Sequence, residues 1–374
     1  MRNVAICGSR VKALLPENRS IETVEIKGIP VTCGLIFSPE PHFDQAAPEN
    51  RFNVLLRTQA FSCNYRDLSL IFAALKRGSE NSFYAAGSDL VGEVLEVGFD
   101  VTSLKPGDRV IPDNSYCMSA NLKAADGVLT NRASKEYQVF PESKLMKIPD
   151  RMPTEVAGAF SIGAQTAYSI IRKLNPVVGA NVLITSARSN TSLFVINALR
   201  KYRVNTYATT TSTGLERRLQ DMGVREVIEV SRSWTPFMTN ERLRDIALSL
   251  GGFDYVIDPF FDLHLDRAID SLAPDGKYIT CGLHEQYQAL LGIRGSDEGP
   301  MMKRVLLSVL IKNLQIIGNC LGTTEDLKNA LQDFSSGALK VAIDDVFADN
   351  EVGAFFHKTY TANERFGKVV YRYN

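Results

Sequence analysis

The chain has 374 residues, a length that predicts two domains. Of these residues 45% are hydrophobic and 22% are charged, which is typical of soluble globular proteins. Lys and Arg number 42 and so do Asp and Glu, so the formal net charge is zero. We therefore expect no nucleic acid and no anionic membrane surface as a partner.

The six cysteines are scattered, and none lies in a CxxC pair. Their spacing predicts neither a zinc cluster nor a disulfide framework and favours reduced thiols in the cytoplasm. The N-terminus has too short an apolar core for a signal peptide. The apolar run Val305–Ile317 is interrupted by Lys312 and Asn313, so no membrane span is expected.

Residues 1–150 are predicted to be mainly β-structure, because short runs of branched and aromatic residues alternate with turn clusters. Irregular strands of this kind favour a partly open barrel, and 112–130 is expected to be an extended loop. The expected strands are Val31–Phe37, Phe52–Ala60, Val91–Val97, Arg109–Ile111 and Glu136–Phe140.

From about Pro153 onward the pattern changes to strands alternating with helices, which predicts a doubly wound parallel sheet. A first helix is expected at Pro153–Leu174. The expected strands are Asn181–Ser186, Asn205–Thr209, Glu226–Val230, Tyr255–Asp258, Lys277–Cys281 and Gln315–Gly318. The expected helices between them are Thr191–Tyr202, Leu215–Met222, Asn240–Leu250, Leu265–Leu272 and Met301–Ile311.

The segment Thr324–Asn374 returns to helix and short strands, ending in Gly367–Tyr371. We expect this segment to rejoin the first domain, which makes the parallel sheet an insertion. The predicted domains are thus 1–150 together with 325–374, and 151–324.

Five motifs in order along the chain resemble those of the medium-chain dehydrogenase/reductase superfamily. They are Cys63-Asn64-Tyr65-Arg66-Asp67-Leu68, Gly87-Ser88-Asp89-Leu90-Val91-Gly92, Lys105-Pro106-Gly107-Asp108-Arg109-Val110, Thr166-Ala167-Tyr168 and Arg365-Phe366-Gly367-Lys368-Val369-Val370. The resemblance covers roughly residues 50–374, whereas residues 1–49 match less well. It implies an α/β protein with a GroES-like, partly open β-barrel catalytic domain and an inserted Rossmann domain.

The resemblance also bears on zinc. Zinc alcohol dehydrogenases of this superfamily place a cysteine where this chain has Asn64, and a His-Glu pair where it has Ser88 and Asp89. An amide and a hydroxyl do not supply the thiolate and imidazole that catalytic zinc prefers. Cys117 stands alone, so the four-cysteine zinc lobe is missing as well. We predict no metal site.

The NYRD and GSD motifs resemble those of zinc-independent quinone reductases and of the enoyl reductase domains of polyketide synthases. This implies an enzyme that uses NADPH to deliver hydride to an activated C=C bond of a small molecule, an enone, enoyl compound or quinone. Hydride addition conjugate to a carbonyl leaves an enolate, which needs a donor near oxygen and a proton source near carbon. The alternatives are a carbonyl or imine reductase on the same scaffold, and a non-catalytic binding or regulatory protein that has lost hydride transfer.

The turn after strand Asn181–Ser186 is where the pyrophosphate would bind, yet Ser186–Ser192 contains no glycine. The candidate contacts are Ser186, Arg188, Ser189, Asn190 and Thr191. Relatives usually have a glycine-rich turn here, so this is a departure. Polar side chains and helix amides can still receive a phosphate, and the alternative is that the residues only cap the helix.

The next strand leads into Thr210, Thr211 and Ser212, and no Asp or Glu lies between Ala187 and Leu215. An NAD site generally has a carboxylate there, which would repel a 2′-phosphate. Hydroxyls near Arg217 or Arg218 therefore favour NADPH over NADH, although both arginines can equally lie on a solvated helix face.

Further cofactor contacts follow from position in the superfamily. They are Thr166 in the TAY motif, Cys281, Gly282 and Leu283 after the fifth strand, Asn319 and Leu321 after the sixth, and Lys368 in the FGK motif. Cys281 can also be an ordinary buried thiol.

The candidate catalytic residues are Tyr65, Asn64, Arg66 and Asp67. Tyr65 can donate to the enolate oxygen or protonate carbon, or simply pack beside the cofactor, and Arg66 and Asp67 can pair to fix the loop. Some relatives carry a further tyrosine near the position of residues 75–77, where this chain has none although Tyr84 follows. The edge strand Gln315–Gly318 is expected to pair with its two-fold mate, giving a homodimer.

Overall fold

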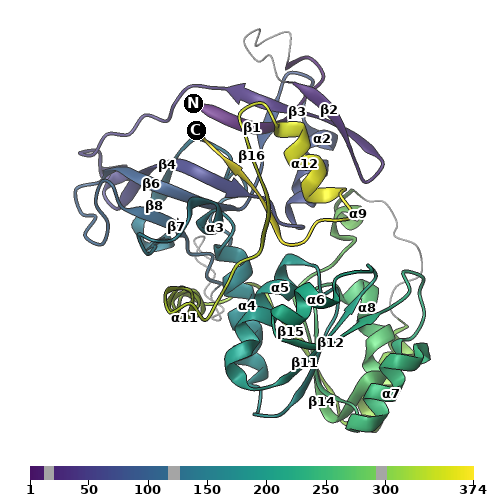
Figure 1. Cartoon of the computed structure of the whole chain (residues 1–374). Helices are drawn as coiled ribbons and strands as arrows, with labels where there is room; N and C mark the ends of the chain where they lie inside the picture. Colours follow the sequence, from purple (N-terminus) through teal and green to yellow (C-terminus); the bar gives the residue numbers. More distant parts are fainter. Residues whose placement is uncertain (12–20, 117–126, 292–300) are drawn as a thin grey trace. The chain divides into compact units, whose positions relative to one another are not determined.

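A computed structural model describes residues 1–11, 21–116, 127–291 and 301–374, except for the side chains of 289–291. The chain forms two compact units (Figure 1). The first unit comprises Met1–Ile162, Leu290–Gly292 and Ala342–Asn374, and the second comprises Gly163–Ala289 and Ile293–Val341. The second unit is thus inserted into the first along the sequence.

The first unit is built on two sheets. A four-stranded antiparallel sheet has the order β2-β3-β1-β5, with β1 Arg2–Cys7, β2 Glu22–Ile26, β3 Ile29–Phe37 and β5 Phe83–Ala85. A seven-stranded sheet has the order β16-β17-β4-β6-β7-β9, with β8 also paired to β4. Its strands are β4 Asn53–Ser62, β6 Asp89–Val97, β7 Arg109–Pro112, β8 Tyr137–Pro141, β9 Leu145–Lys147, β16 Ile343–Ala348 and β17 Lys368–Arg372.

Only β16 and β17 of the seven-stranded sheet run parallel; the other pairs are antiparallel. The helical elements of this unit are η1 Pro48–Asn50, α2 Asp67–Arg77, η2 Glu142–Lys144, α3 Thr154–Ala157 and α12 Val352–Tyr360. Its core contains an aromatic cluster in which Phe61 of β4 contacts Phe355 of α12 and Tyr371 of β17, each with ring centroids 5.4 Å apart. These contacts join the C-terminal segment to the N-terminal part of the chain.

The second unit contains a six-stranded parallel sheet of order β12-β11-β10-β13-β14-β15. The strands are β10 Asn181–Ile184, β11 Asn205–Thr210, β12 Val224–Glu229, β13 Phe253–Asp258, β14 Leu272–Thr280 and β15 Gln315–Gly318. Counted along the chain this order is 3-2-1-4-5-6, the arrangement of a dinucleotide-binding sheet. The chain builds the sheet outward in one direction from β10 and in the other direction from β13. The carboxyl ends of these two neighbouring strands therefore flank the usual ligand crevice.

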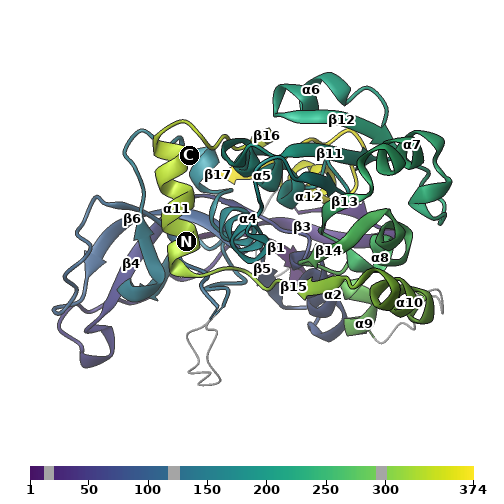
Figure 2. The ribbon, with the colours of Figure 1, turned by 90° about the horizontal axis from the view of Figure 1, so that it is seen from below.

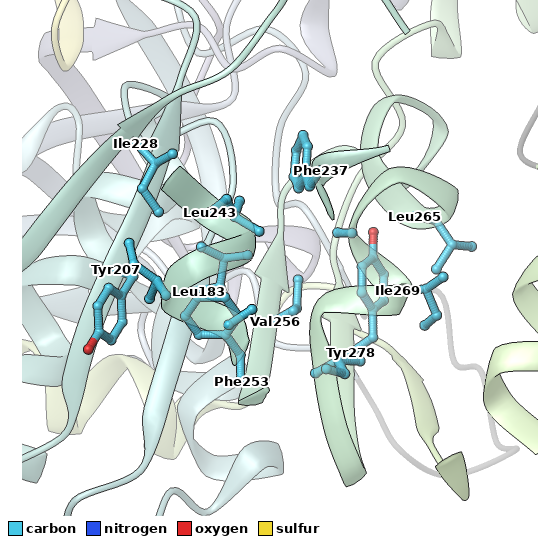
Figure 3. Close-up of a cluster of buried hydrophobic side chains, with 14 of the residues drawn as sticks. Leu183, Tyr207, Ile228, Phe237, Leu243, Phe253, Val256, Leu265, Ile269 and Tyr278 are labelled. Carbon is cyan, nitrogen blue, oxygen red and sulfur yellow. The ribbon is translucent and has the colours of Figure 1, made fainter. Parts of the chain in front are cut away.

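Helices connect the strands of the second unit. They are α4 Ser161–Leu174 (its first two residues in the first unit), α5 Asn190–Leu199, η3 Arg200–Tyr202, α6 Glu216–Asp221, η4 Phe237–Thr239, α7 Glu241–Leu250, α8 Phe261–Ala268, η5 Ile269–Ser271, α9 Gln286–Leu291 (its last two residues in the first unit), α10 Met302–Lys312 and α11 Thr324–Ser335. One hydrophobic core joins the sheet to α7, α8 and α10, with Leu183, Tyr207, Val256 and Tyr278 facing Leu243 and Leu265 (Figure 3).

The sequence prediction of an α/β protein, with a partly open barrel and an inserted doubly wound sheet, is confirmed. The local prediction differs from the structure in two respects. Pro153–Leu174 forms two helices, α3 and α4, rather than one. The strand β1 and the helix α2 were not predicted at all. Of the expected loop 112–130, residues 117–126 lie outside the described part of the chain.

The return to the first unit begins at Ala342 and not at residue 325. The reason lies in α11, which is fastened to α4 within the second unit. Arg172 donates to Asp326 at 2.9 Å, and the Tyr168 hydroxyl donates to Asp333 at 2.5 Å. Among the described residues, no helix is long and apolar enough to cross a bilayer.

Candidate functional site

The NYRD motif forms the turn between β4 and α2 in the first unit. The backbone N–H of Asp67 donates to the carbonyl of Asn64 at 3.0 Å, and the Asp67 carboxylate accepts from the N–H of Asn64 at 2.8 Å. Asp67 is the first residue of α2, where a carboxylate interacts favourably with the helix dipole. The motif is therefore a rigid turn into a helix.

A buried polar network connects this turn to the GSD motif and the FGK motif. The Asn64 amide donates to Ser88 at 3.1 Å and to Asp89 at 2.7 Å. The Lys368 ammonium donates to Asn64 Oδ1 at 2.8 Å and to Asp89 Oδ2 at 2.9 Å. It also lies 3.0 Å from Ser62 Oγ, which completes a set of oxygen acceptors around one cation. We call these side chains, with Asp67, the Lys368 network.

The two carboxylates of the Lys368 network have opposite pKa shifts. Burial raises the pKa of Asp67, and this outweighs the lowering by Arg66 and by the donors on Asn64 and Ser88. Burial also acts to raise the pKa of Asp89. The charge of the Lys368 ammonium and the hydrogen bonds that Asp89 accepts outweigh this effect, so the pKa of Asp89 is lowered. Asp89 is thus the ionised partner of Lys368, while Asp67 resists ionisation.

Asp89 also contacts the start of α4 within the first unit. Its Oδ1 accepts from Ser161 Oγ at 2.7 Å and from the N–H of Ile162 at 2.8 Å, and Asn114 in turn donates to Ser161 at 3.0 Å. An anion at a helix N-terminus satisfies amides that have no partner within the helix. Asp89 therefore joins β6, β17 and the beginning of α4.

Tyr65 and Arg66 follow Asn64 in the NYRD turn, and both side chains are partly exposed. The Tyr65 ring lies 5.8 Å from the Lys27 ammonium, which makes a cation–π contact. Arg66 donates to Asp67 at 3.0 Å and to Asn131 at 2.9 Å. These bonds fit the interpretation in which Arg66 and Asp67 pair to fix the loop. Tyr84 donates to the carbonyl of Asn131 at 3.0 Å, and burial raises its pKa. The role of Tyr65 as the proton donor stays a prediction.

In the second unit, the glycine-free turn connects β10 to α5. Ser189 caps α5, since its hydroxyl accepts from the N–H of Ser192 at 3.2 Å, and Ser192 donates to the carbonyl of Thr185 at 2.9 Å. Asn190 and Thr191 form the first turn of the helix. Ser186 has a φ of +46°, a left-handed conformation, and its hydroxyl lies 2.9 Å from Nε2 of His264.

Capping and cofactor binding are compatible here. Ala187, Ser189 and Ser192 have the spacing i, i+2, i+5 that glycines have in a dinucleotide fingerprint, and all three are small. The turn is followed directly by a helix whose first amides can meet a pyrophosphate. The role of Ser186, Arg188, Ser189, Asn190 and Thr191 as cofactor contacts stays a prediction.

The other predicted cofactor residues of the second unit lie at carboxyl ends of strands. Thr210 ends β11, with Thr211 and Ser212 after it, and the Ser212 N–H donates to Thr210 Oγ1 at 3.1 Å. Arg217 is exposed on the first turn of α6, next to Glu216. Cys281, Gly282 and Leu283 follow β14, and Asn319 and Leu321 follow β15. Parallel strands bring these positions to one edge of the sheet.

Several of these residues also have structural roles. Asn319 accepts from Ser169 of α4 at 2.8 Å and donates to the carbonyl of Leu321 at 3.0 Å. Burial raises the pKa of the Cys281 thiol to about 12, which fits an inert thiol. Thr166 is buried on α4. Lys368 is 1% exposed and bonded within the first unit, so its contact with a cofactor stays a prediction.

The sequence prediction missed two residues that organise these regions. Asp89 was considered only as a replacement for a zinc ligand, yet it anchors the Lys368 network. His264 was not considered, although it contacts the cofactor turn. The signal for Asp89 was that the GSD motif contains a carboxylate and the FGK motif contains a lysine, two side chains that can form an ion pair. Nothing in the sequence connected His264 with Ser186.

Comparison with known proteins identifies the family. Residues 50–150 match the alcohol dehydrogenase GroES-like domain. The chain is 25% identical to acryloyl-coenzyme A reductase of Metallosphaera sedula over 78% of its own length and 83% of that protein. The chain belongs to the medium-chain dehydrogenase/reductase superfamily. It is therefore an oxidoreductase of that type, as the motifs predicted.

Two further comparisons are consistent with this membership. A quinone oxidoreductase-like protein 2 homologue of Nematostella vectensis is 31% identical over 42% of this chain and 40% of that protein. The crystal structure of an NAD-dependent alcohol dehydrogenase matches with a TM-score of 0.75 at 22% identity, covering 100% of this chain and 99% of that one. At that identity the structural match supports the superfamily fold alone.

Proposed function

We propose that this protein is an NADPH-dependent, zinc-independent reductase that delivers hydride to an activated C=C bond of an enone, an enoyl compound or a quinone. The observation that carries the proposal is the Lys368 network, which provides a buried cation and fixed donors beside Tyr65 without a metal-type donor set. The similarity to acryloyl-coenzyme A reductase supports the class of substrate.

Zinc independence is supported by the chemistry of the donors. Asn64 and Ser88, at the positions of two zinc ligands, hydrogen-bond directly to each other. The Lys368 ammonium, 2.8 Å from Asn64 Oδ1, would repel a divalent cation. Among the described residues, no three His, Cys, Asp or Glu side chains gather into a potential metal site.

The preference for NADPH is supported by the residues after β11. Thr210, Thr211 and Ser212 offer hydroxyls and amides, and Arg217 offers a guanidinium in the next helix. Arg and hydroxyl groups are suited to a 2′-phosphate, whereas a carboxylate at the end of β11 would suit the free ribose hydroxyl. Bound NADPH would supply the hydride.

The chain itself would supply orientation and protons. In this proposal Tyr65 donates to the enolate oxygen or to carbon, and Asn64 is a second polar group at the same turn. Asp67 accepts from the backbone N–H of Asn64 at 2.8 Å and fixes the turn, while Asp89 accepts from the Asn64 side-chain amide at 2.7 Å and fixes its orientation. Fixed donors need no reorganisation when charge develops in the transition state.

The deciding experiment measures NADPH and NADH oxidation with a panel of enones, enoyl thioesters, quinones, aldehydes, ketones and imines. We expect turnover with at least one C=C acceptor and NADPH, and a larger thermal stabilisation by NADPH than by NADH. Turnover confined to aldehydes, ketones or imines would support the carbonyl or imine reductase alternative. Cofactor binding or no binding, with no turnover on any acceptor, would support a non-catalytic protein.

We also propose that the protein is a homodimer formed through β15, the edge strand of the parallel sheet. The adjoining helix α10 exposes a row of large apolar side chains, Leu306, Leu307, Leu310 and Ile311, at 57%, 56%, 79% and 73%. Ile316 on β15 is 42% exposed. Figure 2 shows β15 and α10 in the ribbon. A two-fold mate would pair with the open edge of β15 and cover these side chains.

A cytoplasmic location is proposed on the state of the thiols. Cys7, Cys33, Cys63, Cys281 and Cys320 are all free within the described part of the chain. Free thiols are typical of reducing compartments.

A further inference from the structure

Ser186 has a backbone conformation that L-residues rarely adopt. Its φ is +46°, and it stands at the point where β10 ends and the cofactor turn begins. Glycine takes this conformation without a steric penalty, whereas serine takes it at a steric cost. A contact that holds Ser186 in place offsets this cost.

His264 provides that contact. Its Nε2 lies 2.9 Å from the Ser186 hydroxyl, and the imidazole is buried at 6% exposure on α8. The ring packs against Phe237 with centroids 5.8 Å apart, and the guanidinium of Arg267 lies over Phe237 at 4.7 Å. Burial lowers the pKa of His264, so the imidazole is neutral and bonds to the hydroxyl as an uncharged partner. The imidazole is therefore held in one place beside the turn.

Neighbouring residues tie the same turn to the sheet. Thr185 donates from Oγ1 to Asp258 Oδ1 at 2.6 Å, and Asp258 lies at the end of β13, just before α8. On the other side, the N–H of Ala187 donates to the carbonyl of Thr209 at 2.9 Å. The segment from β13 to α8 thus holds Thr185 and Ser186 by successive side-chain bonds, with the Ser186–His264 bond at the strained residue.

A serine beside a histidine can also be a nucleophile and its base. That chemistry needs a third group on the far nitrogen of the imidazole. Nδ1 of His264 makes no hydrogen bond to a carboxylate in the described part of the chain. The pair therefore has the geometry of a support and not that of a hydrolytic dyad.

We propose that His264 is a positioning residue of the cofactor turn. Through Ser186 it imposes the left-handed conformation that a glycine would adopt unaided, and it thereby directs the amides at the start of α5 toward the pyrophosphate. This inference rests on the proposed function, since it assumes that the turn receives NADPH. It explains how Ser186 is held in a left-handed conformation within a turn that contains no glycine.

A matched pair of variants tests the inference. Ser186→Ala and Ser186→Gly both remove the hydroxyl, but only glycine tolerates the observed φ. We expect Ser186→Ala and His264→Leu each to raise the NADPH dissociation constant about tenfold, and Ser186→Gly to stay within about twofold of the wild type. His264→Leu added to Ser186→Gly should have no further effect. Equal losses in the alanine and glycine variants would overturn the inference.

A second readout needs no cofactor. Deuterium uptake of residues 184–192, followed by mass spectrometry in the free protein, reports how firmly the turn is held. We expect faster uptake in Ser186→Ala and His264→Leu and near wild-type uptake in Ser186→Gly. If the wild type binds neither nucleotide, the proposed function fails, and the uptake pattern still decides the role of His264. Unchanged uptake in all variants would refute that role.

Discussion

The ammonium of Lys368 lies 2.9 Å from the carboxylate of Asp89, and these side chains are 1% and 0% exposed. Removing two charges from water costs more than their attraction alone returns, so such a pair is stable only when its remaining donors and acceptors are bonded. Here Ser62, Asn64, Ser161 and the N–H of Ile162 complete it. Lys368, Asp89 and Asn64 come from three sequence motifs that lie far apart in the chain. The pair therefore links the motifs by which the superfamily was recognised.

Lys368→Met tests this pair. The substitution leaves Asp89 as an uncompensated buried charge, and we expect it to lower the free energy of unfolding by about 3–5 kcal/mol. Urea denaturation measures the change. The matched control is Lys147→Met, because Lys147 also bonds an aspartate, Asp108 at 2.6 Å, but is itself half exposed. Little change is expected there, and equal destabilisation by the two variants would contradict a special role for the buried pair.

The two buried aspartates predict opposite pH dependences. The pKa of Asp67 is raised, so its stabilising contribution is complete below the ordinary value of 3.8 and is lost as the pH rises through the folded-state pKa. The pKa of Asp89 is lowered, so its contribution is present above 3.8 and is lost as the pH falls through its folded-state pKa.

Asp67→Asn isolates the first of these contributions, because asparagine does not ionise. We expect the stability of Asp67→Asn relative to the wild type to improve as the pH rises from about 4 to about 8. Urea denaturation across this range measures the difference. The same difference at every pH would show that Asp67 ionises with an unshifted pKa, and a worsening with pH would reverse the assignment.

The alternation of strands and helices in residues 181–318 could be predicted from the sequence because each buried parallel strand is a short apolar run. The strand β1 could not, because it joins other strands only through contacts distant in sequence, such as Ala5 opposite Gly34 and Ala85. The placement of α11 was missed for the same reason. Its attachment depends on Tyr168 and Arg172, which no local pattern connects to it.

The site was predicted less completely than the fold. Motif order located Asn64, Asp67 and Lys368, but it did not reveal that Lys368 is directed into a buried network. The absence of glycine in the cofactor turn suggested weakened binding. The sequence also could not reveal that a histidine 78 residues further along the chain bonds to Ser186 of this turn.

Arg217→Ala tests the preference for NADPH. We expect the dissociation constant for NADPH to rise about tenfold, because a charge-assisted contact to the 2′-phosphate is lost, while that for NADH is unchanged. Isothermal titration calorimetry measures both. Arg225→Ala is the control, since Arg225 lies near the amino end of β12 and bonds to Asn205. Equal weakening of both nucleotides would argue against a 2′-phosphate contact.

Arg188→Ala and Ser189→Ala separate phosphate binding from helix capping. Ser189 is the cap of α5, so its loss should lower the free energy of unfolding by about 1 kcal/mol. Arg188 is in the same turn but is not the cap, so its loss should weaken NADPH about tenfold with little change in stability. Binding titrations and urea denaturation of the two variants measure both effects. An Arg188→Ala variant with wild-type affinity would leave the turn with a capping role only.

Leu310→Glu tests the dimer. Leu310 is 79% exposed on α10, so a charge there should hardly change the stability of one copy, yet it would be buried against the mate in the proposed interface. Sedimentation velocity should find the wild type as a dimer and the variant shifted to monomer, with the dissociation constant raised about tenfold or more. Leu248→Glu is the control, because Leu248 is 69% exposed on α7. A dimer that survives Leu310→Glu, or one that Leu248→Glu disrupts equally, would place the interface elsewhere.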